Sequence, residues 1–370
     1  MNQVVAANSS KCLQDQKMLL LQLRNNLTYD SEVSTKLVKW NQRIDCCQWQ
    51  GVTCNDEGQV IGLDLTNELF SGREVPRKIF QVPTLQTIDS SVNEMLGGSL
   101  PEFPSNGSLQ TLVLSVTKFS GSLPKSIENL RMLSRVEIRA CNFTGLIPTS
   151  MENLTHLVHL DFDLNSFTGS FLYFKLSKNL TYINSARNKL TGISSDWQGL
   201  DNLEHLDLSN NSIAGLIPAS LFYLPSLSEL DGQITELQNV NSPLDDLDLS
   251  ANKLEGPIPE FLFGLHDLLS LSLSFNNFNG TVQLKKFTKL DKIVDLDLSH
   301  NSLSVDTNIS ESELSLLPQL NTFMLASCNL QNVSFLKNQS KLSMLDLSNN
   351  QLTGEIPTGW WKSMMDFSVF

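Results

Sequence analysis

Four cysteines near the start of the chain are the residues whose spacing points most clearly to covalent chemistry. Cys12, Cys46, Cys47 and Cys54 all precede the first copy of a repeated pattern. Four cysteines permit three disulfide connectivities, and the adjacent Cys46 and Cys47 are poorly placed to bond each other. A zinc site is the competing interpretation, but the segment has neither a C-x-x-C pair nor a flanking histidine. Disulfides are therefore favoured, which indicates an oxidising compartment outside the cell.

The five histidines and the many aspartates do not form an arrangement suited to catalysis. The histidines are scattered at positions 156, 159, 205, 266 and 300. His159 and His205 are expected two strands apart on one face, about 10 Å from each other, which is too far to share a metal ion. The chain has no G-x-S-x-G, P-loop or dinucleotide fingerprint, and Asp-rich stretches such as residues 206–208 belong to a strand pattern. We therefore predict a binding protein with no catalytic residue, no metal site and no cofactor.

The elements that position these residues follow from the pattern L-x-x-L-x-L-x-x-N-x-L-x-G-x-I-P, which recurs along nearly the whole chain. Clear copies occupy residues 203–218 and 244–259, and most copies are 23 to 25 residues apart. This period identifies a leucine-rich repeat, and thirteen copies predict a solenoid. The first apolar residue of each L-x-L, called the anchor, is Leu63, Ile88, Leu112, Val136, Leu160, Ile183, Leu206, Leu230, Leu247, Leu271, Leu296, Phe323 and Leu345.

Each position of the repeat has a physical role. The alternation in L-x-L places two apolar side chains on one face of a short strand, and stacked strands bury them in a continuous core. The Gly permits a tight turn, and the Pro ends it in an extended conformation. The Asn five residues after the anchor turns the chain inward, and its amide is expected to bond to loop carbonyls of neighbouring coils. These asparagines are Asn165, Asn188, Asn211, Asn252, Asn276, Asn301 and Asn350.

Two further cysteines occupy the asparagine position. Cys141 and Cys328 stand five residues after the anchors Val136 and Phe323. Small residues with a weak hydrogen-bond donor fit that turn. Eight coils separate the two cysteines, roughly 38 Å, which forbids a disulfide between them. We predict that both are structural thiols.

The cysteines and the repeats divide the chain into four parts. Residues 1–11 are interpreted as a disordered N-terminus or the remnant of a signal peptide, and residues 12–58 as a cysteine cap with helices over 15–25 and 34–40. Residues 59–359 hold about thirteen repeats, which are irregular at 231–243 and 304–318. The first irregularity is a step of only 17 residues between Leu230 and Leu247, and the second is a polar insert. Residues 360–370 are interpreted as a truncated C-terminal end.

Composition narrows the range of partners. The net charge of -13 and the pI near 4.8 argue against nucleic acid or an anionic membrane as a partner. No apolar run approaches the length of about 18 residues that a membrane-spanning helix needs, so no membrane segment is expected in this chain.

Asn-x-Ser/Thr sequences, the acceptors of N-glycosylation, occur eleven times, the first at Asn8. The repeat is itself rich in Asn, Ser and Thr, so we attribute half of them to chance. Together with the cap cysteines they favour a secreted or membrane-anchored ectodomain. The other candidate acceptors are Asn26, Asn106, Asn142, Asn153, Asn179, Asn210, Asn279, Asn308, Asn332 and Asn338.

The side chains that flank each anchor are expected to face outward from the concave strands, where repeat scaffolds bind partners. In many repeats they are monotonous, as Asp246, Asp248 and Ser250 illustrate. The fourth to sixth repeats instead offer charged and aromatic side chains on strands about 5 Å apart, which suits recognition of a peptide or protein. A solvated surface without a partner is the alternative interpretation. The predicted ligand-binding residues are Arg135, Glu137, Arg139, His159, Asp161, Asp163, Tyr182, Asn184 and Arg187.

Two motifs resemble known families. The L-x-G-x-I-P half of the repeat resembles the plant-specific class of leucine-rich repeats, and residues 46–54 (Cys-Cys-Gln-Trp-Gln-Gly-Val-Thr-Cys) resemble the N-terminal cap of plant extracellular members. The resemblance implies an α/β solenoid, a plant-type leucine-rich-repeat right-handed superhelix with a disulfide-bonded helical N-terminal cap. It also implies a second short strand in each coil and the disulfides Cys12–Cys46 and Cys47–Cys54.

Residues 12 to 360 resemble plant receptor-like proteins, and residues 78–83, 117–124 and 325–330 resemble the verticillium wilt disease-resistance branch. Members are cell-surface immune receptors, so the resemblance implies an extracellular or plasma-membrane ectodomain. It further implies a pathogen-derived protein or peptide as ligand and partner receptor kinases for signalling. The chain departs from the family pattern, with about half the expected repeats and no island loop, membrane helix or signal peptide. A secreted polygalacturonase-inhibitor-like protein and a non-functional truncated remnant are the alternatives.

Overall fold

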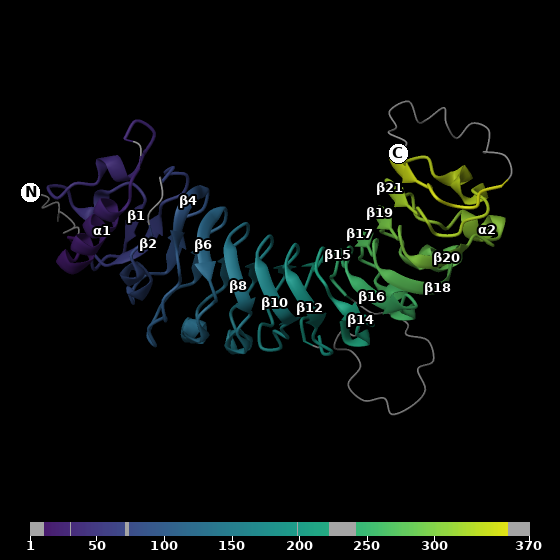
Figure 1. Cartoon of the computed structure of the whole chain (residues 1–370), viewed down its shortest axis with the longest axis horizontal. Helices are drawn as coiled ribbons and strands as arrows, with labels where there is room; N and C mark the ends of the chain where they lie inside the picture. Colours follow the sequence, from purple (N-terminus) through teal and green to yellow (C-terminus); the bar gives the residue numbers. More distant parts are fainter. Residues whose placement is uncertain (1–10, 30, 71–73, 198, 222–241, 354–370) are drawn as a thin grey trace, which may run out of the picture. The chain divides into compact units, whose positions relative to one another are not determined.

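The computed structural model describes residues 11–29, 31–70, 74–197, 199–221 and 242–353 (Figure 1). It contains two compact units, an N-terminal unit of residues 1–168 and a C-terminal unit of residues 169–370. Each unit is built from coils that carry an L-x-L strand and, in most coils, a second short strand and a helical turn. The segments interpreted above as a signal-peptide remnant or disordered N-terminus and as a truncated end lie almost entirely outside the described residues.

Parallel strands formed by the L-x-L segments make the main sheet of the N-terminal unit. The anchors lie opposite one another, Leu63 beside Ile88, Ile88 beside Leu112 and Leu112 beside Val136, and all are buried. This register stacks the apolar side chains into the continuous core that the repeat predicts. The strands are β2 (Val60–Asp64), β3 (Thr87–Asp89), β5 (Thr111–Val113), β7 (Arg135–Glu137) and β9 (His159–Asp161).

The C-terminal unit has a main sheet of the same kind. Leu247 lies opposite Leu206 on one side and Leu271 on the other, and all three are buried. The parallel strands are β11 (Tyr182–Asn184), β13 (His205–Asp207), β15 (Asp246–Asp248), β17 (Ser270–Ser272), β19 (Asp295–Asp297), β21 (Thr322–Met324) and β22 (Met344–Asp346).

The repeat predicted around the anchor Leu230 lies outside the described residues. Strand β13 pairs directly with β15, so Leu206 and Leu247 lie on neighbouring strands of the main sheet. The described residues contain five repeat strands in the N-terminal unit and seven in the C-terminal unit. The prediction of about thirteen repeats therefore stays a prediction. The irregular stretch 231–243 itself lies mostly outside the described residues.

Secondary strands and helical turns complete most coils, as the plant-type pattern predicts. A short 3₁₀-helix follows the Pro of several I-P or similar turns, because proline sets a backbone angle that suits the start of a helix. The 3₁₀-helices are η3 (Arg77–Gln81), η4 (Lys125–Asn129), η5 (Thr149–Asn153), η6 (Ala219–Leu221), η7 (Glu260–Gly264), η8 (Leu284–Lys289) and η9 (Ser334–Asn338). The secondary strands are β4 (Asn93–Gly98), β6 (Thr117–Gly121), β8 (Asn142–Leu146), β10 (Ser166–Phe171), β12 (Lys189–Ile193), β14 (Ala214–Gly215), β16 (Lys253–Gly256), β18 (Asn277–Gln283) and β20 (Ser302–Asp306).

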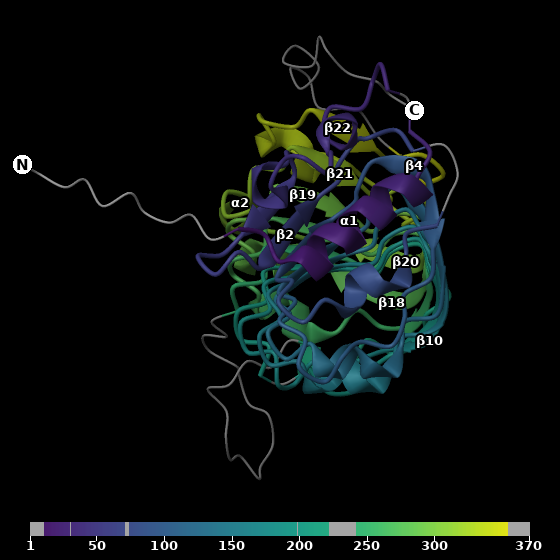
Figure 2. The same ribbon diagram turned by 90° about the vertical axis from the view of Figure 1, so that its left-hand side faces the viewer.

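The cap closes the first coil of the N-terminal unit (Figure 2). Helix α1 (Gln14–Asn26) buries Leu20 and Leu23, and the hairpin of β1 (Val52–Cys54) with β2 joins the cap to the sheet. The helix predicted over 15–25 is confirmed. The one predicted over 34–40 is wrong, because only the single turn η1 (Leu37–Lys39) forms there. Trp40 is extended, which allows its ring to stack on Trp49 at 5.2 Å, so tertiary packing decides the backbone of this segment.

The second irregular stretch, 304–318, contains a helix. Helix α2 (Glu311–Leu314) begins at Ser310, whose hydroxyl accepts from the backbone N–H of Glu313 while the Glu313 carboxylate accepts from the backbone N–H of Ser310. This reciprocal pair is a capping box, and it gives the polar insert an ordered start.

The buried asparagines form a hydrogen-bonded ladder, as predicted. The amide of Asn252 donates to Leu208 O, Leu249 O and Ser250 O at 2.9 to 3.2 Å, and its Oδ1 accepts from Ile213 N at 2.9 Å. One side chain thus satisfies backbone groups of two neighbouring coils. The same bonds to the preceding coil recur at Asn93, Asn165, Asn211, Asn276, Asn301 and Asn350.

In some coils another residue type occupies the position of the ladder asparagine. Cys141 and Cys328 are free and buried, and their sulfurs lie 3.2 and 3.6 Å from Leu114 O and Leu298 O, so the prediction of structural thiols is confirmed. Burial raises the pKa of both thiols, that of Cys328 to about 12. Both therefore remain protonated donors at neutral pH.

Candidate ligand-binding surface

The residues on either side of each anchor face away from the core. Along strands such as β9, β13 and β19, a buried anchor stands between two half-buried neighbours. This alternation follows from the two-residue period of a strand. The outward side of the main sheet in each unit is therefore the surface on which a ligand can bind.

In the N-terminal unit, the predicted residues on β7 and β9 form a connected ionic network. Glu137 pairs with Arg135 on its own strand and accepts from His159 Nε2 at 3.1 Å on the next strand. The hydrogen bond from His159 and the charge of Arg135 lower the pKa of Glu137. Register places Arg135 opposite His159 and Glu137 opposite Asp161, which explains why the four side chains meet.

A second ion pair links the two coils just after these strands. Arg139 Nε lies 3.0 Å from Asp163 Oδ2, and the Asp163 side chain is only 1% exposed whereas that of Arg139 is 53% exposed. The prediction that Asp163 faces a ligand is therefore wrong, since its carboxylate is enclosed and serves Arg139. Burial raises the pKa of the neighbouring Asp161. The structure thus brings all six predicted residues of this unit together, five of them with accessible side chains.

In the C-terminal unit, two of the three predicted residues lie on β11. Asn184 Nδ2 lies 3.4 Å from the Tyr182 hydroxyl, and Asn184 Oδ1 accepts from Ala186 N at 3.0 Å. Arg187 stands four residues after its anchor with φ of 51°, in the left-handed region. The equivalent position is left-handed in other coils too, for example at Phe275 and His300, so this backbone belongs to the repeat.

The sequence prediction missed two residues that continue this surface. The Tyr182 ring stacks on the His205 ring with centroids 4.3 Å apart and planes 5° apart. On the far side, His205 Nδ1 lies 2.8 Å from Asp246 Oδ2. The signal was present in the sequence, because Tyr182, His205 and Asp246 each stand immediately before an anchor and lie opposite one another on adjacent strands.

His205 is in an unusual electrostatic setting. Burial alone would lower the pKa of His205, but the hydrogen bond to Asp246 and the charges of Asp246, Asp207 and Asp245 outweigh burial and raise it. Its second ring nitrogen, Nε2, is enclosed and has no hydrogen-bond partner in the described part of the chain. Tyr182, His205 and Asp246 therefore make a preformed aromatic and charged array across three strands.

The cap contains the predicted disulfides rather than a metal site. Cys12 pairs with Cys46 and Cys47 with Cys54, with Cα atoms 5.6 and 5.5 Å apart. Asp45 lies among the first three sulfurs, but its Oδ1 accepts from the backbone N–H of Cys47 at 2.9 Å. Because the sulfurs are bonded to each other, they cannot act as thiolate ligands for zinc.

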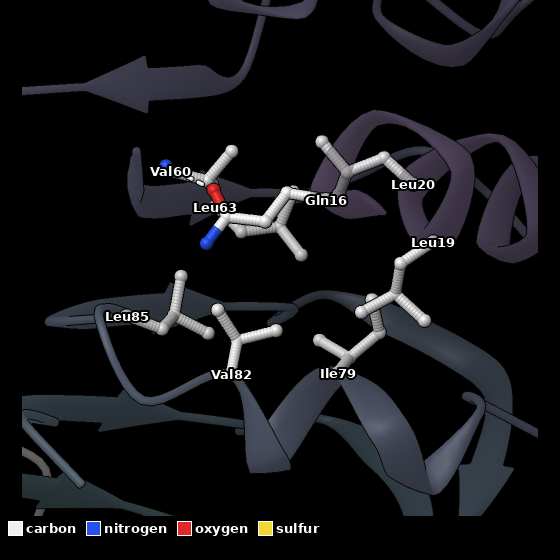
Figure 3. Close-up of a pocket in the computed structure, with 8 residues that line it drawn as sticks. All are labelled: Gln16, Leu19, Leu20, Val60, Leu63, Ile79, Val82 and Leu85. Atoms are coloured by element: carbon white, nitrogen blue, oxygen red, sulfur yellow. Dashed lines mark hydrogen bonds between the residues drawn. The ribbon is translucent and has the colours of Figure 1, made fainter. Parts of the chain in front are cut away.

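A small apolar cavity lies between α1 and the first coil (Figure 3). Gln16 supplies its polar atoms, but these are engaged, with Oε1 accepting from Val60 N at 2.7 Å and Nε2 donating to Thr84 Oγ1 at 3.0 Å. The cavity therefore offers no polar group that could orient a ligand, and we assign it to packing between cap and coil. Its lining is Gln16, Leu19, Leu20, Val60, Leu63, Ile79, Val82 and Leu85.

All ten candidate glycosylation asparagines that lie in the described residues are exposed. Asn142 and Asn279 lie on secondary strands, whereas Asn153 and Asn338 end 3₁₀-helices. Accessibility permits modification at each of them, and their use stays a prediction. Asn8 lies outside the described residues.

Comparison with protein families agrees with this architecture. A leucine-rich-repeat N-terminal domain matches residues 13–55, and leucine-rich-repeat models match residues 108–130, 174–231, 243–265 and 341–363. With the stacked parallel strands and the two cap disulfides, these matches show that the chain contains a leucine-rich-repeat N-terminal domain followed by leucine-rich repeats that form a solenoid fold. No helix among the described residues has the length and apolar character needed to cross a membrane.

Its homologues are plant receptor-like proteins. Receptor-like protein 49 of Arabidopsis thaliana is 35% identical over 412 aligned residues, which cover 97% of this chain and 45% of that protein. Receptor-like protein 9DC1 of Solanum pimpinellifolium is 32% identical over 60% of this chain and 25% of its own length. The chain thus spans less than half the length of these relatives. Particular similarity to the verticillium wilt resistance branch stays a prediction.

Solved structures of plant receptor ectodomains have the same fold. The ectodomain of the receptor kinase GASSHO1/SCHENGEN3 from Arabidopsis thaliana, in complex with CASPARIAN STRIP INTEGRITY FACTOR 2, matches with a TM-score of 0.76 and 27% identity. The match covers 96% of this chain and 43% of that one. A TDR receptor structure matches 81% of this chain and 49% of its own, with a TM-score of 0.68 and 27% identity.

Proposed function

We propose that this chain is the ligand-recognition part of an extracellular plant immune receptor. In this proposal it binds a pathogen-derived protein or peptide, and signalling proceeds through partner receptor kinases. The observation that carries the proposal is the similarity to receptor-like proteins along 97% of the chain. Two receptor ectodomains of the same fold, GASSHO1/SCHENGEN3 and the peptide hormone receptor RGFR1, were solved in complex with their ligands, CASPARIAN STRIP INTEGRITY FACTOR 2 and RGF2.

The proposed contact surface is the outward side of the L-x-L strands in both units. Its accessible members are the predicted residues except Asp163, together with His205 and Asp246. Arg and Tyr are common among the residues that dominate binding energies at protein interfaces. Arg135 suits this role in the N-terminal unit, because its side chain is 47% exposed. Tyr182 suits it in the C-terminal unit, because the stack on His205 holds its ring in one orientation.

The cap disulfides and exposed sequons support an extracellular location, since both modifications belong to the secretory pathway. We therefore propose that the protein is secreted or held at the plasma membrane as an ectodomain and carries N-linked sugars. Peptide mapping after enzymatic deglycosylation would identify the modified asparagines. A secreted protein with all ten described sequons unmodified would contradict this part of the proposal.

A direct binding screen tests the recognition role. The secreted chain would be immobilised and exposed to individually purified proteins secreted by plant-pathogenic fungi and bacteria, with biolayer interferometry as the readout. We expect saturable binding to at least one of them at micromolar concentration or below. Inhibition of a fungal polygalacturonase by the chain would favour the inhibitor alternative. Failure of every protein in a broad panel to bind would count against recognition of a pathogen protein.

A further inference from the structure

The residue four positions after each anchor, called the rim position, has a left-handed backbone in every described coil. In the N-terminal unit, φ at this position lies between 52° and 60°. Asparagine adopts this conformation readily, whereas the branched Cβ of valine makes it strained. In the C-terminal unit five of the seven rim residues are polar, and the seven are Arg187, Asn210, Ala251, Phe275, His300, Ser327 and Asn349.

Four consecutive coils of the N-terminal unit depart from this preference. Their rim residues, which we call the apolar rim, are Val92, Val116, Ala140 and Leu164. Two of them are valines, for which the left-handed backbone is strained. Backbone strain that another residue type would relieve concentrates at sites that bind ligands. The repeat alone therefore does not explain the apolar rim.

The apolar rim is continuous and exposed. The N–H of Val116 donates to Arg139 O at 2.8 Å, and the N–H groups of Val92 and Ala140 make the same bond to the next coil. Because neighbouring coils are about 4.8 Å apart, the four side chains form a row about 14 Å long. Val92 is 45% exposed and Leu164 is 47% exposed. Contiguous exposed apolar side chains of this kind are typical of surfaces that bind proteins.

Arg139 supplies a cation of fixed position between the apolar rim and the proposed contact surface on β7. It stands two residues after β7 and immediately before Ala140. Its Nε donates to Asp163 Oδ2 at 3.0 Å, and the Asp163 side chain is only 1% exposed. The Arg139 side chain is 53% exposed, and its two Nη groups have no hydrogen-bond partner within the described residues. A guanidinium with unused donors binds a carboxylate through short charge-assisted hydrogen bonds.

We propose that the apolar rim and Arg139 bind an extended segment of the protein ligand that carries apolar side chains next to an Asp or Glu. A row about 14 Å long matches four or five residues of extended chain, at about 3.3 Å per residue. The apolar side chains of the segment pack along the rim, and its carboxylate bonds to Arg139. This inference rests on the proposed function for the ligand's being a protein, and it adds the chemistry that the ligand must present to the N-terminal unit.

Asparagine substitutions separate binding from stability at the rim. The double variant Val92→Asn with Val116→Asn introduces the residue type that Asn210 and Asn349 place in the same backbone conformation. We expect its melting temperature to lie no more than about 4 °C below that of the parent chain, because asparagine relieves the strained backbone. A larger decrease would show that the valines are needed for the fold, and it would overturn the inference.

The binding probe is a random dodecapeptide library displayed on phage, selected on the parent chain after removal of phage that bind the double variant. We expect the enriched peptides to combine two or more apolar residues with an Asp or Glu. In fluorescence anisotropy, the most enriched peptide, labelled with fluorescein, should bind the double variant about tenfold more weakly or worse. Replacement of its acids by the corresponding amides should weaken its binding to the parent chain about fivefold or more.

The matched control is Val38→Asn with Leu146→Asn, which changes exposed apolar side chains of the same unit away from the rim. We expect this control to bind the peptide within about twofold of the parent chain. Failure to enrich any peptide, enrichment of peptides without acids, or equal losses in both variants would overturn the inference. A dimer of the parent chain that the double variant abolishes in sedimentation analysis would also overturn it, because the rim would then join two copies of the chain.

The two proposals can fail separately. A pathogen protein that binds the Val92→Asn, Val116→Asn variant as tightly as the parent chain would overturn the role of the rim alone. Peptide binding at the rim without any pathogen protein that binds the chain would count only against the proposed function.

Discussion

The carboxylate of Glu68 accepts a hydrogen bond from the hydroxyl of Ser34 at 2.5 Å in the interior of the N-terminal unit. Glu68 stands five residues after the anchor Leu63, where other coils carry the ladder asparagine. Glu68 faces the cap rather than a preceding coil. In the cap, the backbone N–H groups of Thr35 and Lys36 donate to Glu68 Oε1 at 3.2 and 3.1 Å. A carboxylate only accepts hydrogen bonds, whereas an amide also donates them. A carboxylate therefore suits a site whose neighbouring groups are all donors.

We predict that Glu68→Gln loosens the cap. Glutamine would turn an NH₂ group toward donors and leave at least one of them without a partner, which typically costs about 1–3 kcal/mol. Hydrogen exchange of residues 34–37 should accelerate, and urea should unfold the protein at a lower concentration. Glu57→Gln, at an exposed position of the same unit, is the control. Equal behaviour of the two variants would show that the donors are satisfied without a negative charge.

The two cap disulfides should differ in their contribution to stability. The Cys12–Cys46 pair is separated by 34 residues and the Cys47–Cys54 pair by 7. In the chain-entropy account, a disulfide that closes a longer loop stabilises the folded protein more. The expected contributions to the free energy of unfolding are about 4 kcal/mol for the first disulfide and about 2 kcal/mol for the second. Chemical unfolding of the two double Cys→Ser variants measures this difference. A larger loss from removal of the short loop would contradict the entropic explanation.

The ladder predicts a large difference between two adjacent asparagines. Asn276→Ala removes three donated bonds and the bond that Asn276 Oδ1 accepts from Leu254 N at 2.9 Å, so we expect a loss of about 3 kcal/mol. Asn277 is exposed, and Asn277→Ala should change stability by about 0.5 kcal/mol or less. Urea unfolding of both variants provides the comparison. Similar values would mean that water replaces the lost ladder bonds.

His205 should give the folded protein a pH dependence with a definite sign. Its pKa is raised in the folded state, so its stabilising contribution is complete below the ordinary value of 6.5 and is lost as pH rises through the folded pKa. NMR titration of His205 should give a midpoint above 6.5 that falls in Asp246→Asn. A midpoint at or below 6.5 in the parent chain would show that burial outweighs the aspartates.

Glu137 should act in the opposite direction at acid pH. Its pKa is lowered in the folded state, so its contribution is present above the ordinary value of 4.5 and is lost as pH falls through the lower folded pKa. Below pH 4.5, the free energy of unfolding should therefore fall less in Glu137→Gln than in the parent chain. Parallel curves for the two proteins would mean that the ionic network of His159 and Arg135 does not stabilise the fold.

Sequence reasoning predicts the main sheet well and the details of the surface less well. Anchors such as Leu206 and Leu271 were placed correctly because the repeat period fixes the register of every strand. The anchor Leu230 lies outside the described residues, so its place in the array stays a prediction. Asp246 was missed because its contact with His205 exists only between repeats, and Asp163 was misjudged because an ion pair with Arg139 encloses it.

These contacts also decide which substitutions can test recognition without harming the fold. Arg139 is a poor choice, because Arg139→Ala would leave the enclosed Asp163 carboxylate without its cation. Arg135 is half exposed, and Tyr182 lies on the outward side of β11. Exposed Lys125 and Lys285, on the 3₁₀-helices η4 and η8, provide matched control positions away from the L-x-L strands.

The most direct measurement is the affinity of the double variant Arg135→Ala with Tyr182→Ala for the first pathogen-secreted protein that binds the parent chain. We predict a dissociation constant at least tenfold higher, about 1.4 kcal/mol or more, for a variant that is still folded at the temperature of the measurement. Lys125→Ala with Lys285→Ala should retain the parent affinity. If both double variants bind like the parent chain, ligand recognition by the outward side of the L-x-L strands is contradicted.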